Sequence, residues 1–214
     1  MQLARASVPY LTVSFSIALL CWLGWTRTGE AHTVLRGLSL GGCVVALVLA
    51  AAFTWFFRDP ERAVRRDEAV IVAPGDGTVR RIHRDGRTVT IEIFLALYNV
   101  HVQRAPVSGR VISRRYTKGA YLMAFDDAAG TRNTRCTTVF AAKRGRVEMV
   151  QVAGWAARKV ECWLEPGQAV TQGDRMGIIH LGSQVRVTLP ATAKIVVRPG
   201  DRVAGGLTPV ARWR

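Results

Sequence analysis

Two long apolar runs dominate the first quarter of the chain. They span Ser7 to Trp25 and Gly37 to Phe57, and neither contains a charged residue. Each is close to the ~20 residues that a helix needs to cross a bilayer. Their apolar residues are not confined to one helical face, as those of a helix on a soluble core would be. The pattern therefore predicts a transmembrane helical hairpin that anchors the protein through residues 1 to 58.

Arginines beside these runs predict the orientation of the hairpin. Arg5 precedes the first run, Arg27 and Arg36 lie in the connection, and the second run is followed by Arg58, Arg62, Arg65 and Arg66. An excess of basic residues marks the cytoplasmic side of a membrane helix. We therefore expect a cell-membrane protein whose second domain faces the cytoplasm. A signal peptide is the alternative for the first run, but no convincing small-residue cleavage site follows it.

Beyond Asp59 the pattern changes to short β-rich segments punctuated by Gly, Pro or Asp. The predicted strands are 69–72, 79–82, 88–94, 110–116, 138–140, 146–152, 158–163, 185–189 and 194–197. A short helix is expected over 120–129. The fold class is therefore mainly β, with a β domain over residues 59 to 214 behind the hairpin.

A turn pattern repeats within this domain. Pro166-Gly167 with Val170 and Gly173 recurs 33 residues later as Pro199-Gly200 with Val203 and Gly206. Together with VAPGDGTV (72–79) and RAPVSGRV (104–111), these turns resemble those of lipoyl and biotinyl carrier domains. That resemblance implies a compact β-sandwich or barrel with duplicated turns. It also supplies a rival function, a non-catalytic membrane-anchored adaptor or carrier module.

The amino-acid composition narrows the range of molecules that the protein is expected to bind. The chain of 214 residues carries a net charge of +15, and only four of its 30 basic residues are lysines. Arginine pairs bidentately with phosphate and carboxylate groups. No nucleic-acid-binding motif accompanies these arginines, so a lipid partner is favoured over nucleic acid. The four cysteines lack C-x-x-C spacing and the four histidines lack H-x-H spacing, which argues against a metal site.

The pair Gly182-Ser183 offers chemistry of its own. A serine hydroxyl next to a flexible glycine can attack the preceding carbonyl, and this N→O acyl shift cleaves the chain. Loss of the ester by elimination would leave a ketone-bearing pyruvoyl group at position 183. The alternative is an ordinary Gly-Ser turn before a strand.

Four sequence blocks surround this pair: VAPGDGTV (72–79), NVHVQRAPVSGRV (99–111), QVAGWAARKV (151–160) and GDRMGIIHLGSQVRVTLP (173–190). In order and spacing they resemble the short bacterial and archaeal type of phosphatidylserine decarboxylase. The preceding FFRDPER stretch (56–62) fits as well, and Arg132-Asn133 resembles the family's Glu-Arg-Asn stretch without its Glu.

The resemblance implies an enzyme that converts phosphatidylserine to phosphatidylethanolamine and CO2. Its cofactor is a covalent pyruvoyl group made from Ser183, which forms a Schiff base with the substrate amine and acts as an electron sink. Self-cleavage between Gly182 and Ser183 gives a large chain (1–182) and a small chain (183–214). Further expected partners are membrane phosphatidylserine and, left open, a second copy of the protein.

The proposed catalytic residues are Ser183 as nucleophile, His101 as base and Asp76 as the group that orients the base. Each has an alternative interpretation: Asp76 as a turn residue that stabilises its own backbone, and His101 as a strand histidine with satisfied hydrogen bonds. Longer relatives carry a second His where this chain has Tyr98, for which packing is the favoured interpretation. His180 is a further candidate because it lies three residues before Ser183.

Overall fold

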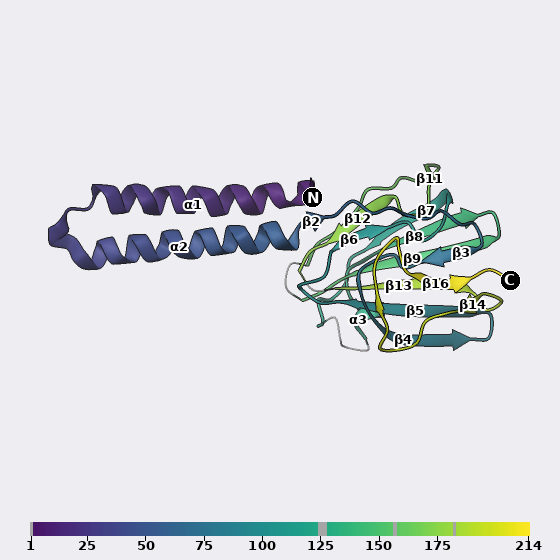
Figure 1. Cartoon of the computed structure of the whole chain (residues 1–214). Helices are drawn as coiled ribbons and strands as arrows, with labels where there is room; N and C mark the ends of the chain where they lie inside the picture. The colour runs from purple at the N-terminus through teal and green to yellow at the C-terminus, as the bar shows by residue number, and fades with distance from the viewer. Residues whose placement is uncertain (1, 124–127, 156–157, 182) are drawn as a thin grey trace. The chain divides into compact units, whose positions relative to one another are not determined.

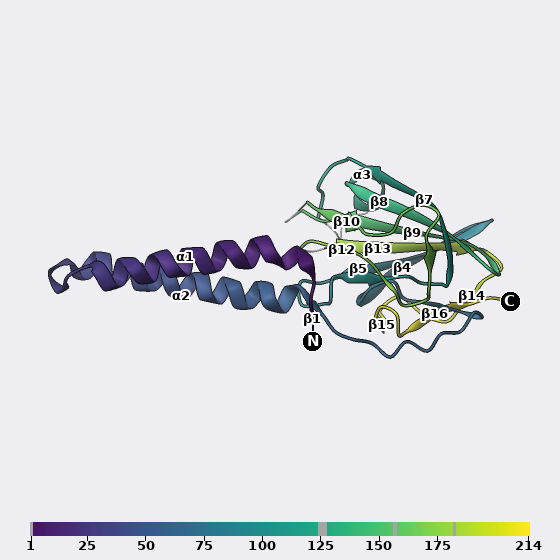
Figure 2. The ribbon, with the colours of Figure 1, turned by 90° about the horizontal axis from the view of Figure 1, so that it is seen from above.

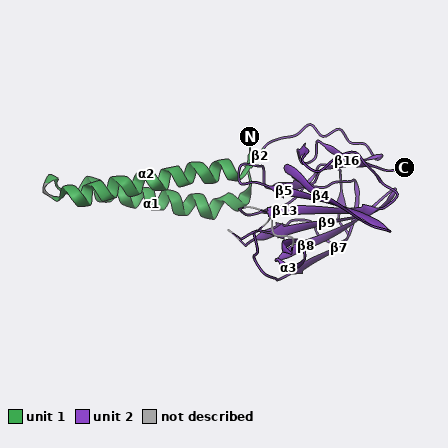
Figure 3. Ribbon diagram, turned by 90° about the horizontal axis from the view of Figure 1, so that it is seen from below, with its two compact units in different colours: residues 1–59 green, residues 60–214 purple. Residues whose placement is uncertain are grey.

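The computed structural model describes residues 2–123, 128–155, 158–181 and 183–214. The chain divides into two compact units, Met1–Asp59 and Pro60–Arg214 (Figure 3). The first unit is helical and the second is built from strands. With 40% strand and 26% helix, the protein is mainly β, as predicted.

The first unit confirms the predicted pair of apolar helices. Helix α1 (Val8–Arg27) and helix α2 (Thr33–Phe56) lie side by side in Figures 1 and 2. Small residues allow the close approach, because a Cβ added at Gly42 would lie 2.9 Å from Cys21 Sγ. Short elements flank the helices: β1 (Gln2–Leu3), η1 (Arg5–Ser7), η2 (Glu30–His32) and β2 (Arg58–Asp59). Strand β1 pairs with β2 and closes the base of the hairpin.

Both helices are long and apolar enough to cross a membrane, with mean hydropathies of 1.7 and 2.1. Their outward surface is apolar, since Leu20, Val34 and Leu38 are all exposed. Such an apolar surface is stable in contact with lipid tails but not in contact with water. The helices therefore indicate membrane association.

One detail of the predicted hairpin is wrong. Arg36 lies inside α2 rather than in the connection, because the helix begins at Thr33. Its guanidinium stacks over the Trp25 ring at 4.9 Å from the centroid and pairs with Glu30 at 3.9 Å. These contacts accommodate the charge within the first turns of the helix.

The second unit contains three sheets, and all of its named strand pairs are antiparallel. Its elements are β3 (Val70–Val72), β4 (Gly77–Asp85), β5 (Thr88–Leu95), β6 (Val102–Arg104), β7 (Gly109–Thr117), α3 (Ala129–Arg132), β8 (Arg135–Ala142), β9 (Gly145–Ala153), β10 (Val160–Cys162), β11 (Ala169–Val170), β12 (Arg175–Ile179), β13 (Ser183–Pro190), β14 (Lys194–Ile195), β15 (Arg202–Val203) and β16 (Pro209–Arg212).

The largest sheet has the order β11-β7-β8-β9-β13-β5-β4-β15 and curls into a half-barrel (Figure 1). Two three-stranded sheets, β10-β12-β6 and β14-β16-β3, complete the unit. Their buried residues, such as Ile71, Met176 and Val210, join Ile91 and Val187 of the large sheet in one apolar cluster. Alternation along each strand sends these side chains to a common core.

The predicted repeat is confirmed, and it includes short strands as well as turns. Gly167 donates its N–H to Val111 O and Gly200 donates to Val79 O, both at 2.8 Å. Short strands then pair in the same way at the two edges of the large sheet, with Val170 opposite Gly109 and Val203 opposite Gly77. We call β3, β4, β14, β15 and β16 the first copy, and β6, β7, β10, β11 and β12 the second copy.

Other local predictions are wrong. In the expected helix over 120–129, Ala129 alone among the described residues is helical, as the first residue of α3. Ala120 instead forms a bridge with Asn133, whose side-chain amide bonds both backbone groups of Leu122. Residues 124–127 lie outside the described part, and α3 follows as a four-residue helix. Strands β6 and β12 were not predicted because Gln103, Arg104 and Gly177 interrupt their apolar pattern.

Candidate active site

Ser183 is the first residue of β13, at the centre of the large sheet. It is opposite Leu95 of β5 on one side and Ala153 of β9 on the other. The side chain is fully buried, and its Oγ has no hydrogen-bond partner among the described residues. A buried hydroxyl in this condition is costly and calls for an explanation in function.

The chain turns sharply just before Ser183. Leu181 has a φ of 42°, in the left-handed region that side-chain-bearing residues rarely adopt. Strain of this kind is common at functional sites. Gly182, the predicted partner in cleavage, lies outside the described residues.

His101 lies between β5 and β6 and is fully buried. Its Nδ1 is 2.9 Å from the carbonyl oxygen of Asn99. A carbonyl can only accept a hydrogen bond, so Nδ1 carries the proton and Nε2 is the basic nitrogen. The His101 carbonyl accepts the N–H of Ile179, four residues before Ser183, which links this histidine to the approach of β13.

Asp76 occupies the loop between β3 and β4. Its carboxylate forms a bidentate pair with Arg62, at 2.6 Å to Nη1 and 2.8 Å to Nη2. Oδ1 also accepts the N–H of Gly205 at 2.8 Å. In the second copy Ser108 occupies the position that corresponds to Asp76, and its hydroxyl accepts the N–H of Gln172 at 2.9 Å. Asp76 therefore has the structural contacts of a turn residue, plus a charge that its counterpart lacks.

Strand register places these groups at one end of the large sheet. Gln184, Phe94 and Thr78 form one row across β13, β5 and β4. Ser183 and Gly77 are each one residue beyond this row, and Asp76 follows Gly77 outward. Two strand spacings of about 4.8 Å separate the backbones of β13 and β4. A relay from Asp76 to Ser183 accordingly needs an intervening group.

His180 forms a second buried acid–base centre that the sequence suggested only by proximity. Its Nε2 is 3.2 Å from Glu161 Oε1, which Lys159 Nζ approaches to 2.7 Å. Burial lowers the pKa of His180 below its usual value, against the attraction of Glu161. Burial tends to raise the pKa of Glu161, but hydrogen bonds from Lys159 and Trp163 outweigh it and leave that pKa lowered. The centre therefore holds a neutral imidazole beside a carboxylate near pH 7.

Sequence reasoning assigned no catalytic role to Arg62, Lys159 or Glu161, although Arg62 ends the FFRDPER stretch and Lys159 lies within QVAGWAARKV. The favoured interpretation of Tyr98 was also wrong, since its side chain is 66% exposed rather than packed. Leu97 and Trp155 are exposed too, at 58% and 59%. These residues follow β5 and β9, the two strands that flank Ser183. The described rim beyond Ser183 is thus partly apolar.

Comparison with known proteins places these residues in a wider context. Residues 49–211 match the family model described as phosphatidylserine decarboxylase. A phosphatidylserine decarboxylase proenzyme of Symbiobacterium thermophilum is 39% identical over 182 residues, covering 81% of this chain and 84% of the relative. One of Streptomyces avermitilis is 37% identical over 213 residues, covering 99% and 94%. One of Chlorobaculum parvum is 40% identical over 172 residues, covering 77% and 80%.

Proposed function

The chain belongs to the phosphatidylserine decarboxylase family, and we propose that it makes its own cofactor by breaking the Gly182–Ser183 bond. It is a decarboxylase of the proenzyme type, which excludes the purely non-catalytic carrier alternative. The proposed products of maturation are chains 1–182 and 183–214. The mature enzyme would convert phosphatidylserine to phosphatidylethanolamine and CO2.

In the proposed cleavage, His101 Nε2 removes the proton from Ser183 Oγ, which attacks the carbonyl carbon of Gly182. The C–N bond breaks, the released nitrogen takes the proton from the imidazolium, and an ester replaces the amide. A base then removes the Cα proton of residue 183, the Cβ–Oγ bond breaks, and the released oxygen leaves as the carboxylate of Gly182. Water hydrolyses the remaining dehydroalanine, which releases ammonia and leaves the pyruvoyl group at position 183.

The observation that carries this proposal is the buried Ser183 Oγ with no hydrogen-bond partner among the described residues. Support also comes from His101, whose contact with Asn99 O leaves Nε2 as the basic nitrogen. Asp76 is proposed to stabilise the imidazolium through its negative charge, while Asn99 fixes the tautomer. Arg62 would then set how strongly that charge acts.

The same residues suit a pyruvoyl group at position 183. Once formed, that group supplies a carbonyl electron sink for the amine of the serine head group. The ends of β5 and β9 would enclose it, since both flank Ser183. His180, neutral and held by Glu161, is the proposed site for taking up or returning a proton.

We place the enzyme at the cell membrane with its β unit on the cytoplasmic face. The supporting features are the two apolar helices and the arginines that follow α2. Exposed Leu97, Tyr98 and Trp155 would face a substrate that stays in the bilayer. Anchoring raises the rate at which enzyme and lipid meet.

Intact mass spectrometry of the purified protein tests the cleavage. We expect two chains divided between Gly182 and Ser183, the smaller one lacking an N-terminal amine. Ser183→Ala should remain a single chain of 23.5 kDa and show no decarboxylase activity. Ser183→Thr is the matched variant, because it keeps a hydroxyl and should cleave slowly. Full activity in Ser183→Ala would refute the pyruvoyl mechanism.

A further inference from the structure

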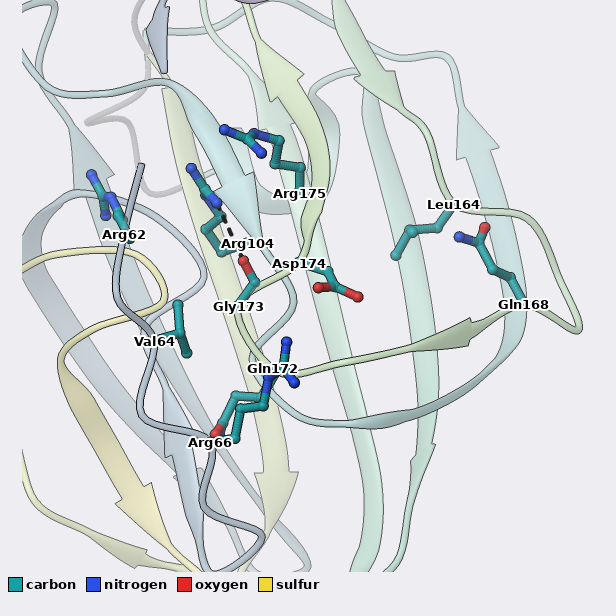
Figure 4. Close-up of a pocket in the computed structure, with 10 residues that line it drawn as sticks. All are labelled: Arg62, Val64, Arg66, Arg104, Leu164, Gln168, Gln172, Gly173, Asp174 and Arg175. Atoms are coloured by element: carbon teal, nitrogen blue, oxygen red, sulfur yellow. Dashed lines mark hydrogen bonds between the residues drawn. The ribbon is translucent and has the colours of Figure 1, made fainter. Parts of the chain in front are cut away.

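A basic pocket of about 510 Å³ opens on the β unit, and one arginine of its lining, Arg62, also pairs with Asp76. Four arginines line it: Arg62, Arg66, Arg104 and Arg175. Figure 4 shows the guanidinium groups of Arg62, Arg104 and Arg175 on the same side of the view, with Arg66 lower down. The volume lies in the range of binding sites for small ligands.

The walls of the pocket are fixed by the duplicated turns. The linker over residues 60–66 crosses these turns, and a Cβ added at Gly173 would lie 2.5 Å from Val64 Cγ2. Arg104 is 5% exposed and donates to the carbonyl oxygens of Gly173 and Pro60, at 3.4 and 3.0 Å. The fold therefore holds Arg62 and Arg104 in place, while Arg66 and Arg175 line the pocket from exposed positions.

Two of the arginines face each other across a strand pair. Arg104 of β6 is directly opposite Arg175 of β12, and like charges in this relation destabilise a sheet. The first copy has Val72 opposite Pro209 at the corresponding place. The fold itself consequently does not require arginine here.

The charge balance of the pocket favours an anion. Among the residues that line it, four guanidinium groups lie beside one carboxylate, Asp174, and Arg62 also pairs with Asp76 outside the lining. Asp174 also accepts the N–H of Thr171 at 2.7 Å. Guanidinium forks pair bidentately with phosphate oxygens, and a phosphate between Arg104 and Arg175 would turn repulsion into attraction.

We propose that this pocket binds the phosphate group of an anionic phospholipid, at a place distinct from the substrate site at Ser183. The four residue steps of β12 from Arg175 to Ile179 separate the pocket by about 13 Å from the His180 end. Arg62 follows the end of α2 by only six residues, a tether of at most about 20 Å. The choice of lipid over soluble phosphate rests on the membrane attachment in the proposed function.

The test uses full-length protein in a neutral detergent and titration calorimetry with dihexanoyl phosphatidic acid. Dihexanoyl phosphatidylcholine measures non-specific partitioning into the micelles, and inorganic phosphate tests the soluble source. We expect saturable binding of phosphatidic acid that weakens at least tenfold in Arg66→Gln/Arg175→Gln. The control is Arg65→Gln/Arg144→Gln, which removes the same charge at exposed arginines outside the pocket and should bind normally.

Equal weakening in the two double variants would mean general charge attraction and overturn the site. Equally tight binding of inorganic phosphate would overturn the assignment to a lipid. Thermal unfolding without ligand shows whether the pocket variant is destabilised. If it is, phosphatidic acid binding is measured on the single variant Arg66→Gln, at an exposed position, and unchanged binding there would overturn the site. Phosphatidic acid carries no serine, so its binding is independent of turnover. Decarboxylation of phosphatidylserine, measured in parallel, reports separately on the proposed function.

Discussion

The two copies in the β unit share a backbone plan but differ in chemistry. Each has a glycine-bounded turn that docks on the edge of the large sheet through the same hydrogen bonds. The first copy supplies Asp76 where the second has Ser108. The second copy supplies Arg104, where the first has Val72. The duplicated frame provides stability, and the candidate function lies where the copies depart from each other.

The largest effect is expected from removing the negative charge that distinguishes Asp76 from its counterpart Ser108. Asp76→Asn should slow self-cleavage by roughly 10²–10⁴-fold, because the imidazolium of His101 loses its stabilising carboxylate. Arg62 would also be left buried beside a neutral amide, at a cost to folding stability. The fraction of cleaved chain over time, read by intact mass, measures the first effect.

A double variant separates chemistry from folding. Adding Arg62→Gln to Asp76→Asn removes the stranded guanidinium and should recover much of the thermal stability but not the cleavage rate. Recovery of both would show that Asp76 acts only as a turn residue, like Ser108.

A pair of glycine substitutions tests whether the copies are equivalent in folding. A Cβ at Gly77 would lie 2.1 Å from Phe94 O, and one at Gly109 would lie 2.2 Å from Ala141 O. Each Ala variant should therefore lose about 1–3 kcal/mol of stability through overpacking. Thermal unfolding measures both. A large difference between them would contradict the equivalence of the copies. Gly86→Ala, with no atom within 4 Å but a φ of 45°, measures the cost of backbone strain without overpacking.

Ser108→Ala should have a smaller effect. It removes the acceptor for the N–H of Gln172 and should cost about 1 kcal/mol. Cleavage at Gly182 should proceed at the normal rate, because Ser108 carries no charge toward His101. If Ser108→Ala slowed cleavage without changing stability, the second copy would take part in the cleavage reaction.

The smallest expected effect concerns His180, which neither copy duplicates. Its folded pKa lies below 6.5, so its stabilising contribution is complete above that pH and is lost as the pH falls through the folded pKa. The melting temperature should therefore drop between pH 7 and pH 5.5, and less so in His180→Gln. Glu161 also has a lowered pKa, but its window lies below 4.5. The exposed His83→Gln is the control, and an equal drop in all three proteins would contradict the assignment.

The sequence predicts those parts of the fold that depend on the local pattern of apolar and polar residues. Strands β5, β9 and β13 alternate between apolar and polar residues, and the hairpin is uninterrupted by charge, so both were predictable. Short strands such as β6 were not, because Gln103 is buried only through its bonds with Gln151 and the His101 carbonyl. The hydrogen-bond partners that allow a polar side chain to be buried in this way are brought together only by the tertiary structure.

The candidate site divides in the same way. Ser183, His101 and Asp76 were predicted from motifs, but the Arg62–Asp76 pair and the Glu161–His180 pair join residues 14 and 19 positions apart that share no motif. The basic pocket also gathers arginines from three separate segments. No spacing rule predicts such meetings, which follow from the duplicated fold.

The position of β13 has a consequence for the mature protein. Hydrogen-bonded ladders hold this strand to β5 and β9 along nearly its full length. The segment 183–214 also contributes β14, β15 and β16, which belong to two different sheets. A nick before Ser183 would therefore create two polypeptides that remain interlocked, like the complementing fragments of a split protein. Separating them would require global denaturation, so maturation would alter covalent connectivity while leaving the architecture whole.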